Sequence, residues 1–287
     1  ATPLHVAASK GHVEVVTTLH EMGANIEATL KTGATPLHVA VQTGNMEVVR
    51  TLHEVGANIK ATDNIGGTPL HIAAFEGRVE MVKLLCELGA EVDVSNNRVN
   101  TPLLTAVQAG NAEMVRALAE LGANLNGSNR LSPGCTAIIV AARQGQAQVI
   151  RTLASLNVDV TAAASEDSPV QCTPLMLSAN FAHFEATKTL LLLGAPVTIA
   201  DLRNQTPFGL GYDTRQLRTD LQAWAADALV QHRIFQRTFL FGCSAHGDIA
   251  LTILGGEEAL RAKVAEFVGV VVGEELRRTR AVGPAIA

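Results

Sequence analysis

Apolar residues along this chain gather in short runs at helical spacing, and the runs come in pairs that recur about every 33 residues. The run VEMVKLLCEL at residues 79–88 is typical, because its Val, Met and Leu positions share one face of a helix. Between successive pairs lie polar segments with glycine, such as ANIEATLKTGA at residues 24–34. The pattern predicts pairs of short antiparallel helices joined by extended connections.

A threonine opens the first helix of each pair. These threonines are separated by 33, 33, 33, 35, 37 and 33 residues, and most precede a proline. A Thr hydroxyl accepts one of the unpaired N–H groups of a helix start, and proline presets the helical φ at the first position. Each Thr therefore marks a predicted helix N-terminus. The positions are Thr2, Thr35, Thr68, Thr101, Thr136, Thr173 and Thr206.

Glycines are predicted to end both helices of a pair, because glycine readily adopts the left-handed conformation that closes many helices. Asn157 and Ala182 stand where glycine is expected, so we expect repeats five and six to be locally weaker. A glutamate in the first turn of the second helix meets the positive end of the helix dipole. The glycines are Gly11, Gly44, Gly77, Gly110 and Gly145, then Gly23, Gly56, Gly89, Gly122 and Gly194; the glutamates are Glu14, Glu47, Glu80, Glu113 and Glu185.

Helices this short are marginally stable alone, and each leaves apolar residues that nothing in its own pair covers. Neighbouring pairs must therefore pack on one another. The openings TPLHVAA at Thr2, TPLHVAV at Thr35 and TPLHIAA at Thr68, with looser later copies, closely resemble those of ankyrin repeats. The resemblance implies an all-α solenoid with short β-hairpin connections, a stack of about seven ankyrin repeats over residues 1–213. It also implies that three histidines tie each unit to its hairpin by hydrogen bonds, namely His5, His38 and His71.

Residues 214–287 lack the repeat and are expected to form a helical C-terminal cap and tail. Residues 215–241 read as one longer helix whose apolar side chains cover the exposed end of the array. Residues 257–280 read as a second helix, which either packs on the first or begins a further domain. The chain enters its first repeat part-way, at Ala1 and without an initiator Met, so a signal or further repeats could precede it.

The resemblance implies a binding groove, lined by the hairpin tips and by the exposed ends of the first helices. Seven and eight residues after each Thr the side chains vary, as expected of a binding row or of an unconstrained solvated face. Phe75 and Phe181 favour binding, because exposed aromatic groups are typical interface anchors; the alternative is that either packs on its neighbouring repeat. The predicted binding row comprises Lys10, Gln42, Phe75, Glu76, Gln108, Arg143, Gln144, Asn180 and Phe181.

Two connections are longer than the others, by two residues before Thr136 and by four before Thr173. Insertions in a solenoid map to loops on one face, often the binding face. Drift in a loop that tolerates changes of length is the alternative explanation. The second insertion adds Glu166 and Asp167 to the predicted partner-binding residues.

Composition narrows the range of partners and compartments. A formal net charge of −5 gives no electrostatic reason to expect nucleic acid or an anionic membrane surface. The longest apolar runs fall well short of the roughly 20 residues of a membrane-spanning helix, so we expect no membrane insertion. Cys135 and Cys172 precede the Thr of adjacent repeats, about 8–10 Å apart if stacked and beyond the ~7 Å reach of a disulfide. We expect free thiols at Cys86, Cys135, Cys172 and Cys243, and an intracellular, cytoplasmic location.

No catalytic or metal-binding pattern rises above background. HEMGA at His20 and HEVGA at His53 lack the second histidine of a zinc helix, and both are expected to be satisfied structural histidines. CSAHGD at residues 243–248 places a thiol, an imidazole and a carboxylate closer in sequence than is usual for a nucleophile and its base. We predict no enzyme activity, no cofactor and no metal.

The predicted function is a monomeric protein–protein interaction module, a scaffold or adaptor that binds another protein. One alternative is the targeting region of a larger multidomain enzyme, such as a kinase or a ubiquitin-pathway protein. The other is a structural spacer without a partner.

Overall fold

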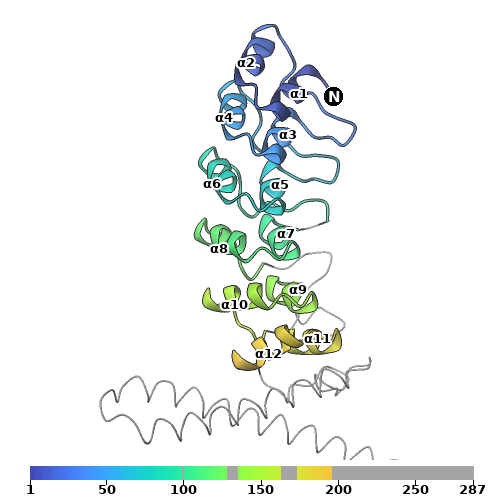
Figure 1. Ribbon diagram of the computed structural model, residues 1–287, viewed down its shortest axis with the longest axis vertical. Helices are drawn as coiled ribbons and strands as arrows, with labels where there is room; N and C mark the ends of the chain where they lie inside the picture. Colours follow the sequence, from blue (N-terminus) through green and yellow to red (C-terminus); the bar gives the residue numbers. More distant parts are fainter. Residues whose placement is uncertain (99, 128–134, 163–172, 196–287) are drawn as a thin grey trace, which may run out of the picture. The chain divides into compact units, whose positions relative to one another are not determined.

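The computed structural model describes residues 1–98, 100–127, 135–162 and 173–195 (Figure 1). This part holds twelve helices of seven to nine residues and no β-strand. The predicted seventh repeat, the C-terminal cap, Glu166 and Asp167 lie outside the described residues. The helices are α1 (Pro3–Lys10), α2 (Val13–Glu21), α3 (Pro36–Thr43), α4 (Met46–Glu54), α5 (Pro69–Phe75), α6 (Val79–Glu87), α7 (Pro102–Gln108), α8 (Ala112–Glu120), α9 (Ala137–Arg143), α10 (Ala147–Ser155), α11 (Pro174–Asn180) and α12 (Phe184–Leu192).

The chain forms two compact units. The first consists of Ala1–Ala141, Gln148–Asp159 and Ala164–Pro169, and the second of Ala142–Ala147, Val160–Ala163 and Val170–Ala287. In the first unit, α1, α3, α5 and α7 pack one on the next, α2 packs on α4, and α6 packs on α8 (Figure 1). The connections extend beside the layer of first helices. In the second unit, α11 packs on α12.

The interior lies between the helix layers and between successive repeats. A leucine in the last turn of each second helix from α4 to α12 is completely buried. Each stands 17 residues after the threonine of its repeat, so one sequence position supplies the same buried contact throughout. These residues are Leu52, Leu85, Leu118, Leu153 and Leu190. The all-α repeat fold predicted from the apolar pattern is confirmed.

The connections form hairpin turns rather than strand ladders. The N–H of Leu30 donates to the carbonyl of Ala34 at 2.9 Å, and Asp63 donates to Gly67 at 2.9 Å. Asn96 donates to Asn100 at 3.0 Å. Each turn closes across five residues, and the described part of the chain has no residue in a strand. The hairpins predicted from the resemblance are therefore present as turns without paired strands.

Threonine and histidine together cap the first helices of the early repeats. Nε2 of His38 lies 3.1 Å from the Gly67 carbonyl oxygen, which can only accept, so Nε2 carries the proton and Nδ1 is an acceptor. Nδ1 then accepts from the Thr35 hydroxyl at 2.9 Å and from the Thr35 N–H at 3.2 Å. The same arrangement joins Thr2 to His5 and Thr68 to His71.

Each of these histidine rings also donates a hydrogen bond to the second arm of the hairpin that follows its helix pair. Nε2 of His5 donates to the carbonyl of Ala34, and Nε2 of His71 donates to the carbonyl of Asn100. The role implied for the three histidines is confirmed. His53 differs from its prediction as a satisfied residue, because its Nδ1 is buried and has no hydrogen-bond partner.

The predicted stop glycines adopt left-handed backbone conformations, with φ between 72° and 103°. Asn157 and Ala182 take the same conformation at φ values of 62° and 56°. For alanine this region is sterically disfavoured, because Cβ approaches its own backbone carbonyl. Ala182 is exposed, so no buried contact of its methyl group offsets that cost.

We predict that Ala182→Gly stabilises the protein by about 1 kcal/mol, because glycine adopts a positive φ without the steric penalty. Chemical denaturation monitored by circular dichroism measures the change. Ala119→Gly, inside α8, is the matched control and should destabilise by roughly 0.5–1 kcal/mol. Equal effects of the two substitutions would contradict the strain at Ala182.

We also predict that the protein loses stability as the pH falls below about 6.5. Burial lowers the pKa of both His38 and His71. For His38 it outweighs the hydrogen bond to the Gly67 carbonyl and the attraction of Asp63 and Glu27, which raise the pKa. For His71 it outweighs the hydrogen bond to the Asn100 carbonyl and the attraction of Asp63. Above that pH both rings are neutral in the folded and unfolded chains, so they add no pH dependence. Below it the unfolded chain takes up protons that the folded chain resists, and the free energy of unfolding decreases.

Denaturation midpoints measured between pH 7.5 and 5 test this sign. In the double variant His38→Gln/His71→Gln the midpoint should be lower but should change less over this range. NMR titration of the two rings gives a second readout, since both should titrate below 6.5. Titration of both above that value would rule out burial as the dominant cause.

Candidate partner-binding surface

The predicted binding row lies at the surface. Its members in the described part of the chain are exposed, except Asn180, which is half-buried. Phe75, the last residue of α5, is 62% exposed and Phe181, just after α11, is 50% exposed. Most of the Phe75 side chain is therefore exposed to solvent and not covered by a neighbouring repeat. The Phe181 ring stacks on His183, with centroids 6.2 Å apart and an angle of 23° between the rings.

Hydrogen bonds from the following repeat hold the ends of several first helices. The Asn45 side-chain amide donates to the carbonyls of Ala8 at 2.8 Å and Ser9 at 3.1 Å. The Arg78 guanidinium donates to the carbonyl of Gln42 at 3.0 Å. In the second unit, Nε2 of His183 donates to the carbonyl of Arg143 at 3.0 Å. The backbone that carries the row is thus fixed at these points while its side chains point to solvent.

Charge on the row is mixed. Lys10, Glu76 and Arg143 alternate in sign along the chain, and uncharged glutamines occupy positions 42, 108 and 144 of the row. A row of this kind does not concentrate one sign of potential, so it lacks the electrostatic footprint of a nucleic-acid site. The row is distinguished by two separate exposed aromatic rings, Phe75 and Phe181, which have polar neighbours.

The hairpin tips of the first unit pack closely on one another. The Asn64 N–H donates to the carbonyl of Thr32 at 3.0 Å, and its side chain donates to Lys31 at 2.8 Å. One repeat further on, Asn97 donates in the same way to Ile65 and Asn64. The tips therefore form one continuous edge beside the first helices.

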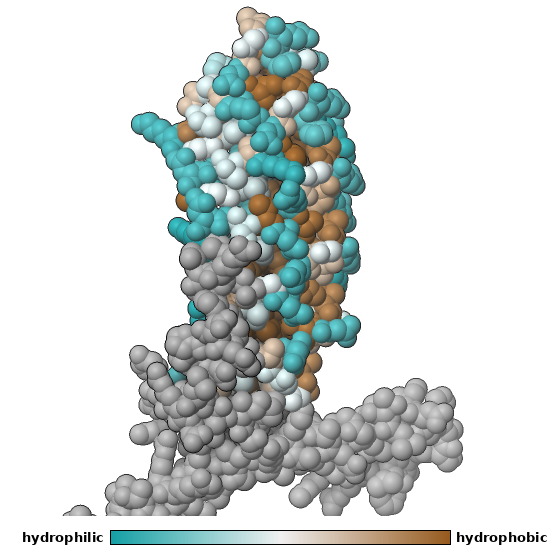
Figure 2. All heavy atoms as spheres, turned by 180° about the vertical axis from the view of Figure 1, so that it is seen from behind, coloured by the Kyte–Doolittle hydropathy of each residue, from teal (hydrophilic) through white to brown (hydrophobic). Residues whose placement is uncertain are grey.

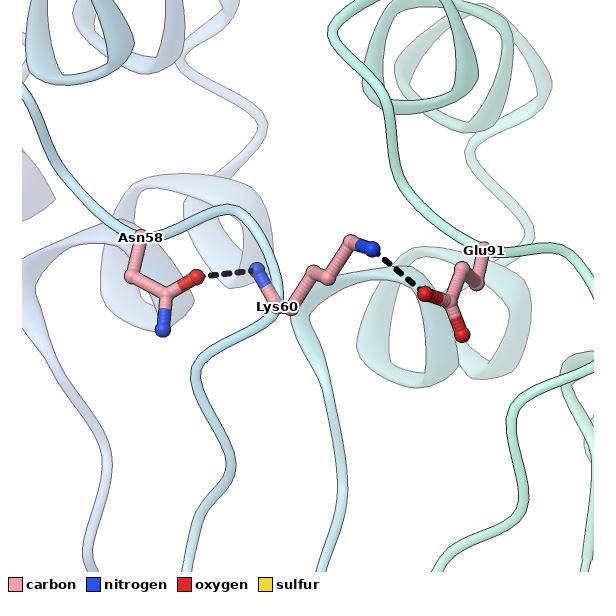
Figure 3. Close-up of polar contacts among 3 residues, drawn as sticks. All are labelled: Asn58, Lys60 and Glu91. Atoms are coloured by element: carbon pink, nitrogen blue, oxygen red, sulfur yellow. Dashed lines mark hydrogen bonds and ion pairs between the residues drawn. The ribbon is translucent and has the colours of Figure 1, made fainter.

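A second line of contacts joins the hairpin arms, and its chemistry changes from repeat to repeat. The Glu27 carboxylate accepts from the Asn58 N–H at 2.8 Å, and Asp93 accepts from the Asn124 N–H at 3.0 Å. At the intervening step, Lys60 stands at the position of those acids and pairs with Glu91 of the next repeat (Figure 3). Lys60 and Glu91 side chains are 55% and 62% exposed, so this ion pair contributes little stability.

The structure adds an apolar residue that the sequence interpretation missed. Ile65, at the hairpin tip between Asp63 and Gly67, is 49% exposed. The corresponding tip residues are Thr32 and Arg98, each three residues before the threonine that opens the next repeat. The variation of residue type at this position could have indicated a surface position from the sequence. Apolar groups also reach the surface elsewhere, in a band flanked by polar side chains on the face shown in Figure 2. Apolar exposure alone therefore does not single out the predicted row, whereas its aromatic rings do.

Comparison with protein families gives a match to the family described as ankyrin repeats, over residues 4–96 and 93–164. The chain belongs to the ankyrin-repeat family. The comparison with curated proteins gave no match.

Two solved ankyrin-repeat domains have a similar fold. The domain of human ASB11 is 24% identical, with a TM-score of 0.63. The domain of Bcl-3, described as a unique member of the IkappaB protein family, is 25% identical, with a TM-score of 0.65. In each case 76% of this chain and 96% of the solved chain are covered. Ankyrin-repeat domains are generally protein-interaction modules, which use the extended surfaces of the array.

Two further features are absent from the described residues. None of the helices there combines the length and apolarity needed to cross a membrane. Within the same residues no group of three or more His, Cys, Asp or Glu side chains is arranged to hold a metal ion.

We predict that Gly33→Ala destabilises the protein much more than Gly23→Ala. Both glycines have a left-handed backbone, with φ of 82° and 83°, so both substitutions carry a strain of roughly 1 kcal/mol. A methyl group at Gly33 would also lie 2.5 Å from the Asn64 backbone nitrogen, whereas one at Gly23 meets nothing within 4 Å. We expect Gly33→Ala to cost at least about 2 kcal/mol by chemical denaturation. Similar costs for the two variants would show that the tips do not depend on this close contact.

Proposed function

We propose that this chain binds a protein partner along the surface formed by the ends of the first helices and the hairpin tips. The observation that carries the proposal is Phe75, a large aromatic side chain that is 62% exposed on a well-held scaffold. Leaving such a ring in water forgoes about 1.5–3 kcal/mol of burial free energy, which a partner would recover. Phe181 offers a second ring of the same kind.

The hydrogen bonds that hold the helix ends and tips support this proposal. A partner that binds a preorganised surface does not have to order its backbone, so less of the interaction energy is lost on binding. Polar side chains at Gln42, Glu76 and Gln108 then supply a rim around Phe75. Glu166 and Asp167 remain part of the proposed surface.

We further propose that the module acts as a monomer, inside the cell and without catalysis of its own. Cys86 and Cys135 are free thiols, as expected in a reducing compartment. Burial raises the pKa of the Cys86 thiol, which keeps it in the unreactive protonated form. A cytoplasmic location agrees with the free thiols.

Phe75→Ala should weaken partner binding by at least about tenfold in Kd, the effect expected of an interface anchor. Because the ring is exposed, the free energy of unfolding should change by less than about 0.5 kcal/mol. Partners identified by quantitative affinity capture with the unmodified chain would be measured against both proteins by calorimetry.

Met22→Ala is the matched control. Met22 is 78% exposed at the end of a second helix, outside the proposed row, so its truncation should leave the Kd unchanged. Equal losses for the two variants would indicate non-specific apolar attachment. Identical capture with and without Phe75 would favour the structural spacer.

A further inference from the structure

The connection after α8 carries the one Asn–Gly pair in the sequence, Asn126–Gly127. Asn126 is exposed and lies in a turn, and Gly127 is half-buried. The Gly127 N–H donates to the Asn124 carbonyl at 3.3 Å, which is longer than the usual limit of about 3.2 Å for such a bond. The backbone nitrogen of Gly127 is therefore only weakly held.

The side chain of Asn126 is less constrained than those of two comparable asparagines. It makes no hydrogen bond to any residue that the structure describes. The side chains of Asn58 and Asn124 instead accept from the backbone N–H two residues further on, at 3.0 and 3.1 Å. These two asparagines also precede bulky residues, Ile59 and Leu125. Of the three, Asn126 can turn its amide carbon toward the following nitrogen without breaking a hydrogen bond.

We propose that Asn126 is a site of spontaneous deamidation. The Gly127 nitrogen forms a bond to Cγ of Asn126, the bond from Cγ to the amide nitrogen breaks, and ammonia leaves with the proton of the Gly127 N–H. Water then opens the cyclic succinimide at either carbonyl carbon, which gives aspartate or isoaspartate. Gly127 has no Cβ to obstruct the approach of the two groups.

The reaction adds a negative charge to the line of contacts along the hairpin arms. Asn126 stands 25 residues after the threonine of its repeat, at the position that Glu27, Lys60 and Asp93 occupy in the earlier repeats. Asp93 there accepts from the Asn124 N–H at 3.0 Å, so this position already holds an aspartate in another repeat. The aspartate product is therefore compatible with the fold, whereas isoaspartate adds a carbon atom to the backbone.

The test follows the full chain during incubation at neutral and mildly alkaline pH. Trypsin releases residues 117–130 as one peptide that contains both Asn124 and Asn126. Mass spectrometry should show this peptide becoming about 1 Da heavier, with conversion at Asn126 at least about tenfold faster than at Asn124. An isoaspartyl methyltransferase should methylate the isoaspartate product. Equal conversion of the two asparagines, or conversion of neither, would overturn the proposal.

Gly127→Ala is the matched control, because it retains Asn126 but adds a methyl group beside the attacking nitrogen. That methyl group would lie 3.3 Å from the Asn124 carbonyl oxygen, an approach that a small shift relieves. Conversion at Asn126 should slow by at least about tenfold. An unchanged rate would show that Gly127 does not set the reaction and would overturn the proposal.

Comparison with the chain unfolded in urea tests the contribution of the structure independently of any variant. Because the Asn126 amide is exposed and the Gly127 nitrogen is weakly held, the folded chain should convert within about tenfold of the unfolded rate. Stronger protection in the folded chain would overturn the proposal. Asn126→Asp, which reproduces the aspartate product, should retain the circular dichroism spectrum of the unmodified chain. Loss of helix in that variant would overturn the inferred compatibility of the product with the fold.

Discussion

Contact between successive repeats is the constraint on which the first unit depends. Helices of seven to nine residues do not hold together alone, and here each finds its missing apolar contacts on the next pair. The completely buried leucines at one position of each described repeat after the first, such as Leu52 and Leu85, mark these contacts. Any substitution that separates two repeats therefore affects both of them, because neither has an independent core.

The polar groups follow from the same constraint. Where one repeat packs on another, side chains donate hydrogen bonds to backbone carbonyls at the helix ends and hairpins. His38, Arg78 and Asn64 supply donors from three parts of the repeat. The side chains of the proposed binding row can then vary, because other side chains hold the backbone that carries them.

Much of this fold could be predicted because it rests on residues with narrow local roles. Threonine before proline marks the helix starts, and glycine marks the stops, including the substitutes Asn157 and Ala182. The partner of a side chain in another repeat is harder to predict, because spacing does not determine its rotamer. The unpaired Nδ1 of His53 and the exposure of Phe75 and Ile65 depend on such details. For the candidate surface, sequence variation indicated the row but did not distinguish an exposed ring from a packed one.

The contacts along the hairpin arms affect which repeats the chain can lose or duplicate. Glu27 accepts a hydrogen bond from Asn58, and Lys60 forms an ion pair with Glu91, so neighbouring repeats carry complementary rather than identical surfaces. Removing the second repeat, residues 35–67, would place Glu27 against Glu91, so that two carboxylates meet at one junction. Deleting this repeat would therefore leave a like-charge pair at the new junction, with a small penalty because the side chains are exposed, whereas duplicating it would set Lys60 against Asn58 without bringing like charges together.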